Sequence, residues 1–277
     1  MRSLNARCLV ARNLSVMSLI VAGAIAPAAY AKDEALAKAI AGSHRTPALV
    51  ARDSVRKPQE VLEFAGLKPN MVVIEIIPGG GYWTEILGPY LKDKGTYYTT
   101  VSPASGGERA VAGATAWRKK LDDGKAALGM VKTAEFGRGT TDIVPAGSAD
   151  AVLTFRNVHN WMSGGIAEDA FAQFYKALKP GGVLLVEEHR ARTDQPQDPK
   201  AASGYVREDY TIGLAEKAGF KLAGKSEVLA NPKDTKDYAG GVWTLPPTYR
   251  NGETDKAKYT AIGEADNFLL KFEKPKK

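Results

Sequence analysis

Three consecutive glycines, Gly79-Gly80-Gly81, follow a short apolar run and are the first candidate for chemistry in this sequence. Glycine lets the backbone approach a ligand closely, and the N-terminus of a following helix offers N–H groups without partners. The preceding run, Met71–Ile77, is apolar except for Glu75, as in a strand buried on both faces. The pattern predicts a strand, a glycine turn and a helix that together bind a ligand. A tight turn without a ligand explains the glycines alone equally well.

Histidine supplies the second candidate chemistry, because imidazole exchanges protons near neutral pH. His159 follows one predicted strand and His189 ends the next, so we expect both at the carboxyl edge of a sheet. His44 lies in a basic N-terminal segment, and we expect it at the same rim. We predict that His159 is a general base, with Asn157 as its catalytic companion and with Asn157 and Trp161 shaping the pocket. A histidine hydrogen-bonded in a loop, without a catalytic role, is the alternative.

No metal site is predicted, although His159, His189 and Glu188 together have suitable ligand types. Neither a His-x-His nor a Glu-x-x-His spacing supports such a site. The only cysteine is Cys8, which lies in the predicted leader.

Three arginines, Arg45, Arg52 and Arg56, precede the first predicted core helix. A guanidinium pair could clamp a carboxylate or phosphate. The favoured interpretation is a solvated basic face, with Asp53 and Glu60 as partners.

The elements that must position these residues alternate between strand and helix patterns with short glycine links. This order predicts an α/β fold with a doubly wound, mostly parallel sheet. Residues 32–68 form an N-terminal helical cap, and residues 231–266 form an insertion before the last strand, Asn267–Glu273. Trp243, Pro246 and Pro247 favour a packed lid in this insertion. The predicted elements are Lys32–Ala41, Gln59–Leu67, Met71–Ile77, Tyr82–Leu91, Thr96–Val101, Ala110–Leu121, Gly129–Phe136, Asp150–Phe155, Ala167–Leu178, Val183–Glu188, Asp209–Ala218 and a strand opened by Gly219-Phe220.

Residues 73–81 read VIEIIPGGG, and residues 148–152, 178–183 and 218–220 lie at the starts of later predicted strands. The first of these motifs resembles the first motif of the class I S-adenosylmethionine-dependent methyltransferases, and the others resemble the later strand entries of that family. The resemblance is closest to a group of predicted methyltransferases with signal peptides, which share residues 156–161 and 243–247. It implies a seven-stranded sheet whose last strand is antiparallel, and S-adenosylmethionine as cofactor. The cofactor-binding residues that it implies are Glu75, Pro78, Gly79, Gly80, Gly81 and Tyr82.

Two positions depart from the family pattern. Ile77 stands where the first glycine is expected, and its β-branched side chain would crowd the methionine end of the cofactor. Thr100-Val101-Ser102 stands where an acid would hold the ribose hydroxyls, which removes a charge-assisted contact.

The N-terminus has the pattern of a signal peptide, with three arginines, an apolar run at Leu14–Ala28 and Ala29-Tyr30-Ala31 as the cleavage site. An uncleaved anchor is the alternative. We expect cleavage after Ala31, a single domain over 32–277, a periplasmic or secreted location and no stable membrane anchor. The net charge of the whole chain is +7, without a basic run interleaved with aromatics, so we expect no nucleic-acid partner.

The combined expectation is an exported methyltransferase-like protein that acts on an unknown small molecule. The alternative is a non-catalytic periplasmic ligand-binding protein on a degenerate copy of the same fold. An NAD(P)-linked oxidoreductase is disfavoured. The Tyr-x-x-x-Lys spacing of such enzymes occurs at Tyr175 and Lys179, which we assign to a helix core and a helix C-terminus.

Overall fold

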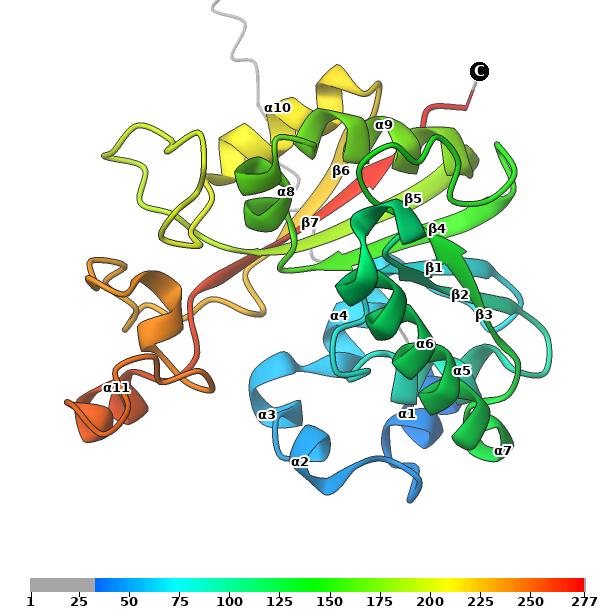
Figure 1. Cartoon of the computed structure of the whole chain (residues 1–277), viewed down its shortest axis with the longest axis horizontal. Coiled ribbons are helices and arrows are strands. Elements are labelled where there is room, and N and C mark those ends of the chain that lie inside the picture. The colour runs from blue at the N-terminus through cyan, green and yellow to red at the C-terminus, as the bar shows by residue number, and fades with distance from the viewer. Residues whose placement is uncertain (1–32, 277) are drawn as a thin grey trace, which may run out of the picture. The chain divides into compact units, whose positions relative to one another are not determined.

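Seven strands form one mixed sheet at the centre of the computed structural model, which describes residues 33–276 (Figure 1). The strand order is β3-β2-β1-β4-β5-β7-β6, and β7 runs antiparallel to both of its neighbours. The predicted doubly wound, mostly parallel α/β sheet with an antiparallel last strand is confirmed. The predicted signal peptide lies outside the described residues. The strands are β1 Val72–Ile76, β2 Thr96–Val101, β3 Val131–Glu135, β4 Ala149–Phe155, β5 Leu178–His189, β6 Lys221–Ser226 and β7 Asn267–Glu273.

Alternation along the central strands divides the apolar core into two layers, because successive side chains point to opposite faces. In β1, Ile74 and Ile76 join the cluster beneath one helical layer, whereas Val73 joins the cluster beneath the other. All three side chains are fully buried. This burial on both faces explains why β1 is a continuous apolar run with one acid.

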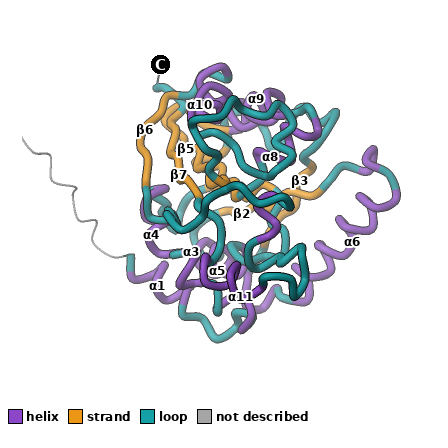
Figure 2. The backbone as a smooth tube through the Cα atoms, turned by 90° about the vertical axis from the view of Figure 1, so that its left-hand side faces the viewer, coloured by secondary structure: helices purple, strands orange, loops and turns teal. Residues whose placement is uncertain are grey.

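Helices cover both faces of the sheet, as Figure 2 shows, with α8, α9 and α10 on one face. The opposite layer is built on α1, α4 and α5, with α6 projecting beyond the strands. Among the described residues, none of the helices combines the length and the apolarity needed to cross a membrane. The helices are α1 Glu34–Ile40, α2 Pro47–Val50, α3 Asp53–Arg56, α4 Pro58–Ala65, α5 Thr84–Leu91, α6 Glu108–Asp123, α7 Lys125–Leu128, α8 Val158–Gly164, α9 Ala167–Ala177, α10 Glu208–Lys217 and α11 Lys256–Ile262.

Most predicted elements agree with the structure to within a few residues, and β2 and β7 have the predicted bounds. Two differences affect the site. Helix α8 begins at Val158, shortly after β4, in a segment to which the sequence analysis assigned no element. Strand β5 begins at Leu178, five residues before the predicted start, because Leu178 pairs with Ala149 ahead of a register shift.

The insertion 231–266 is a folded lobe beside the carboxyl edge of the sheet, coloured orange in Figure 1. It contains a 3-10 helix, Gly241–Thr244, and α11. Val242, Leu245 and Ala265 form a separate apolar cluster with Tyr205. The insertion therefore has a small core of its own, which holds Trp243 at the edge of the site described next.

Candidate functional site

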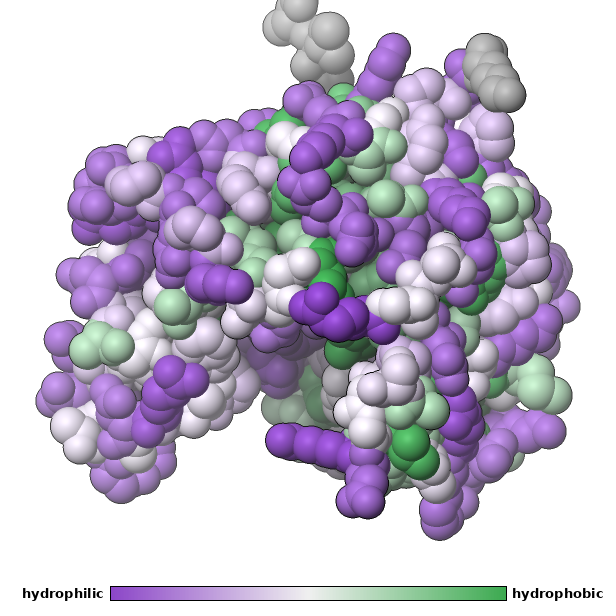
Figure 3. Space-filling model, turned by 45° about the horizontal axis from the view of Figure 1, so that its top comes forward, coloured by the Kyte–Doolittle hydropathy of each residue, from purple (hydrophilic) through white to green (hydrophobic). Residues whose placement is uncertain are grey.

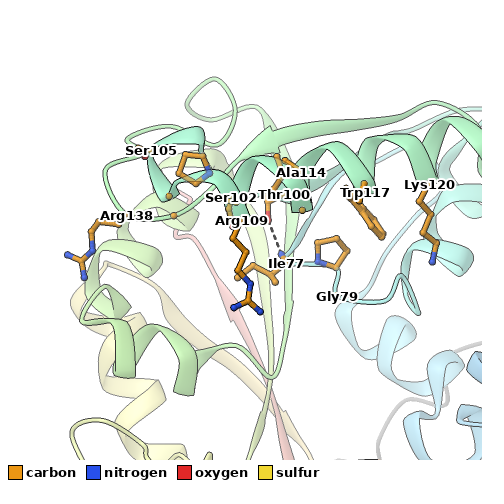
Figure 4. Close-up of a pocket in the computed structure, with 18 of the residues that line it drawn as sticks. Ile77, Gly79, Thr100, Ser102, Ser105, Arg109, Ala114, Trp117, Lys120 and Arg138 are labelled. Carbon is orange, nitrogen blue, oxygen red and sulfur yellow. Dashed lines mark hydrogen bonds between the residues drawn. The ribbon is translucent and has the colours of Figure 1, made fainter.

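Two cavities meet at the glycine turn between β1 and α5. The larger, which we call the α6 cleft, has a volume of about 1180 Å³ and lies between the turn, the ends of β2 and β3, and one side of α6 (Figure 4). The smaller, which we call the histidine pocket, has a volume of about 370 Å³ and is lined by His159 and His189. Ile77–Gly80 line both cavities, so four residues form their shared wall.

The histidine pocket is closed on one side by the insertion. Trp243, Pro246 and Pro247 line it from that lobe, and Leu49, Arg52 and Arg56 line it from the N-terminal cap. A hollow beside the lobe is visible in the space-filling view (Figure 3). Three segments far apart in the sequence therefore enclose the pocket.

The glycine turn is open toward the cavities at two of its three glycines. A Cβ atom at Gly79 or Gly80 would meet no atom within 4 Å. A Cβ atom at Gly81 would lie 3.1 Å from Lys120 Nζ and 3.2 Å from the Trp117 ring, and Gly81 has φ +90°. Gly79 and Gly80 thus face ligand space, whereas Gly81 lets α6 approach the turn and lines neither of the two cavities.

Ile77 has a left-handed backbone, with φ +51°, at the junction of the two cavities. This conformation is a real outlier for a β-branched residue. The N–H of Ile77 donates to Thr100 Oγ1 at 2.8 Å, and the residue is 44% exposed. The fold therefore keeps the backbone shape that favours glycine and places a branched side chain between the cavities.

Glu75 lies beneath the turn and is only 1% exposed. Its carboxylate accepts hydrogen bonds from Thr84 Oγ1 at 2.7 Å and from the hydroxyl of Tyr97. Burial, opposed by these two bonds, raises the pKa of Glu75 to about 7. Glu75 thus connects β1 to β2 and to the start of α5, and it borders the histidine pocket.

Tyr82, the last residue of the implied cofactor-binding set, is buried under the N-terminal cap. Its hydroxyl donates to Asp53 Oδ1 at 2.7 Å, and its ring borders the histidine pocket. Burial raises the pKa of this tyrosine well above its ordinary value. Tyr82 therefore stays a neutral phenol that joins the turn to α3.

The α6 cleft has a basic lining. Arg109, Lys120 and Arg138 border it, and no carboxylate does so among the residues the structure describes. Lys120 Nζ donates to Gly80 O at 2.6 Å, and Trp117 Nε1 donates to Thr99 Oγ1 at 2.9 Å. These two contacts hold α6 against the turn and leave the cleft between them and the end of β2.

His159 and His189 lie side by side, with ring centroids 5.6 Å apart. Glu188 is completely buried and accepts hydrogen bonds from His159 Nδ1 at 3.0 Å and from the His189 backbone N–H at 2.8 Å. Burial alone would raise the pKa of Glu188, but the neighbouring His159 imidazole holds this pKa below its ordinary value. Since a carboxylate only accepts, His159 Nδ1 carries a proton, and in the neutral imidazole Nε2 has the free lone pair.

His189 is neutral in the folded protein. Its Nδ1 lies 2.7 Å from Asn267 Oδ1, which only accepts, so Nδ1 is protonated. Burial lowers the pKa of His189 to about 3.

The prediction that His44 lies at this rim is wrong. His44 Nε2 contacts Glu85 O at 2.7 Å, and His44 lines neither cavity, because the cap places it against the first turn of α5 in a separate small pocket.

Asn157 lines the histidine pocket, but its side-chain amide forms hydrogen bonds with β1 and β4. Its Nδ2 donates to Ile76 O at 3.1 Å and to Thr154 Oγ1 at 3.2 Å.

The expectation that Trp161 shapes the pocket is wrong. Helix α8 turns Trp161 into the core, where its ring packs 5.3 Å from Phe174.

Arg45, Arg52 and Arg56 do not form the solvated face of the favoured sequence interpretation, although the expected partner Asp53 does pair with Arg45. Arg45 is 4% exposed and forms two hydrogen bonds with Asp53, at 2.6 and 2.8 Å. Arg52 forms two hydrogen bonds with Glu264, at 2.8 and 2.5 Å. Arg56 is 7% exposed and stacks over the Tyr82 ring at 4.5 Å.

Sequence reasoning missed Arg156 and two acids as site residues. Arg156 follows β4 with φ +61°, lines the histidine pocket and pairs with Glu187 at 3.7 Å and Glu264 at 3.6 Å. Burial raises the pKa of Glu187 to about 7. The only signal in the sequence was the position of Arg156 in the segment 156–161. Across residues 33–276, no three His, Cys, Asp or Glu side chains are grouped to hold a metal ion.

Known structures match this architecture, whereas no protein-family model and no curated protein matches the sequence. The chain is similar to a SAM-dependent methyltransferase from Aquifex aeolicus, with a TM-score of 0.53 and 18% identity over 81% of this chain and 93% of that chain. It is also similar to the [4+2]-cyclase SpnF, with a TM-score of 0.53 and 15% identity over 87% of this chain and 92% of that chain. At these identities the similarity shows the fold, which is that of the class I methyltransferases.

Proposed function

We propose that this protein is an exported S-adenosylmethionine-dependent methyltransferase that acts on a small molecule. The observation that carries the proposal is the shared wall Ile77–Gly80 between a large cleft and a smaller pocket. Transfer of a group between two ligands requires their reacting atoms to meet. In this arrangement the α6 cleft holds the cofactor, and the histidine pocket holds the acceptor.

The residues of the α6 cleft fit a nucleoside cofactor in volume and in the open glycine turn. Gly79 and Gly80 present backbone without side chains, and Ser102 ends the cleft beside β2. Val101 replaces the expected acid, so no carboxylate would hold the ribose hydroxyls there. When bound, S-adenosylmethionine supplies an electrophilic methyl group.

The histidine pocket offers a base. His159 Nδ1–H is fixed on Glu188, which leaves Nε2 as the acceptor for a proton from an acceptor hydroxyl or amine. Asn157 holds the end of β4 against β1, so it positions the pocket rather than exchanging protons. The buried carboxylate of Glu188 stabilises the imidazolium that proton transfer creates.

Calorimetric titration with S-adenosylmethionine and S-adenosylhomocysteine tests the proposal. We expect micromolar binding, and we expect Gly80→Asp to weaken it by about tenfold or more, because the new side chain enters the space beside both cavities. Gly213→Asp is the matched control, since a Cβ atom there also meets no atom within 4 Å and the residue lies in α10, away from both cavities.

The result that contradicts the proposal is equally clear. If neither compound binds the unmodified protein at millimolar concentration, the cofactor assignment fails. The chain would then be a ligand-binding protein on the same fold. SpnF, described as a [4+2]-cyclase, shows that this fold is not confined to methyl transfer.

A further inference from the structure

Arg56 is a buried cation without a carboxylate partner among the described residues. Its Nε is fully buried and makes no hydrogen bond, and the guanidinium rests on the face of the Tyr82 ring. Only 7% of the surface of Arg56 is exposed. Of the two cavities, Arg56 lines only the histidine pocket. Arginine cannot release its proton in proteins, so this charge persists inside the fold.

Each of the neighbouring arginines forms an ion pair with a carboxylate. Arg45 pairs with Asp53, Arg52 pairs with Glu264, and Arg156 shares Glu264 with it. A buried charge is costly unless it is paired, and a cation–π contact offsets only part of that cost. The fold thus supplies acids to three arginines and leaves the fourth facing a cavity.

Four tyrosine, tryptophan and phenylalanine side chains form part of the histidine pocket beside this cation, together with charged residues that include Glu75 and Glu264. Tyr82, Trp83, Phe155 and Trp243 line it, and Trp83 stacks on Phe155 with ring centroids 4.2 Å apart. Its volume of about 370 Å³ suits a small molecule of one or two rings. A planar ligand body and an anionic end are therefore both accommodated.

We propose that the histidine pocket binds a small carboxylate-bearing molecule and that Arg56 is its anion anchor. A planar fork of N–H donors matches a carboxylate in two parallel hydrogen bonds. The carboxylate has two candidate sources, a planar acceptor acid or the amino-acid end of the cofactor. The binding assertion does not rest on the proposed methyl transfer, since an anion can occupy this pocket without a cofactor.

The first test uses benzoate and its neutral isostere benzamide, with binding followed by calorimetry in the absence of any nucleoside. If the carboxylate comes from an acceptor, benzoate binds at least tenfold more tightly than benzamide. Arg56→Gln abolishes that preference, Arg56→Lys retains part of it, and Arg192→Gln leaves it unchanged, because Arg192 is exposed and pairs only with Asp194. Thermal unfolding of each variant verifies that the fold is intact.

The second test compares S-adenosylhomocysteine with methylthioadenosine, which lacks the amino-acid end. If Arg56→Gln weakens S-adenosylhomocysteine tenfold and leaves methylthioadenosine unchanged, the anchored carboxylate belongs to the cofactor. If Arg56→Gln affects benzoate alone, the carboxylate belongs to the acceptor. If the native protein does not prefer benzoate and Arg56→Gln also leaves S-adenosylhomocysteine unchanged, the anion anchor is refuted. Since benzoate is tested alone, failure of cofactor binding does not affect that arm.

Discussion

The left-handed backbone of Ile77 can be tested by a pair of substitutions, Ile77→Ala and Ile77→Gly. Both remove a side chain that is 44% exposed, so each loses roughly half of the 1.5–3 kcal/mol that full burial of such a side chain provides. They differ in backbone strain. A left-handed conformation costs an L-residue about 1–2 kcal/mol and costs glycine almost nothing.

The strain term exceeds the opposing entropy term at this position. Glycine loses about 0.5–1 kcal/mol relative to alanine through its freer unfolded chain. We therefore expect Ile77→Gly to be more stable than Ile77→Ala by about 0.5–1 kcal/mol. Urea unfolding at pH 7 measures this difference, and thermal unfolding should show it as a shift of about 1–4 °C for a chain of this size.

The neighbouring strand residue Ile76 is the matched control. Ile76 is fully buried in β1 and has no positive φ, so Ile76→Gly should be less stable than Ile76→Ala by about 0.5–1 kcal/mol. The order of glycine and alanine therefore reverses between adjacent residues. If alanine is as stable as glycine at position 77, the strain argument is refuted.

Two further predictions concern pH. The pKa of Glu75 is raised to about 7, so between pH 4.5 and 7 the folded state holds a proton that the unfolded state releases. The contribution of Glu75 to the free energy of unfolding therefore falls by about 1.4 kcal/mol per pH unit as the pH rises through that window. Glu75→Gln should remove this loss. The difference in unfolding free energy between the native protein and the variant should therefore change between pH 5 and pH 8, as measured by urea unfolding. An unchanged difference would contradict the reasoning. Because the pKa of His189 is lowered to about 3, the folded protein should lose stability as pH falls from 6.5 toward 3. His189→Asn should lessen that acid loss, and equal acid midpoints for the two proteins would contradict this.

The sheet could be predicted from sequence because its strands are short apolar runs separated by glycine. The proximity of His159 and His189 followed from topology, since each comes after or ends one of two adjacent parallel strands. The position of Trp161 could not be predicted without α8, which begins one residue after Asn157 and turns the indole toward α9. Helix α8 is short and lacks a side-chain hydrogen bond at its N-terminus, so it leaves a weak local signal.

The ion pairs that Glu264 forms with Arg52 and Arg156 are long-range and therefore invisible in sequence patterns, whereas the Arg45–Asp53 pair, with the expected partner, spans only eight residues. Arg52 and Glu264 are 212 residues apart, and only the folded insertion brings them together. Local spacing instead suggested Glu60 as an arginine partner, although the structure leaves Arg56 without a carboxylate among the described residues. Charge compensation depends on which segments meet in three dimensions, and for this reason the sequence alone did not single out Arg56.

The shared wall between the cavities is a route by which ligands on its two sides would affect each other. Ile77–Gly80 border both spaces, so a ligand that shifts this backbone on one side changes the shape offered on the other. Thermodynamic linkage requires such an effect to be reciprocal, with each ligand changing the affinity of the other by the same factor. Ile77, with its left-handed backbone, is the first residue of this wall. We therefore expect ligands in the two cavities to change each other's affinity through this turn.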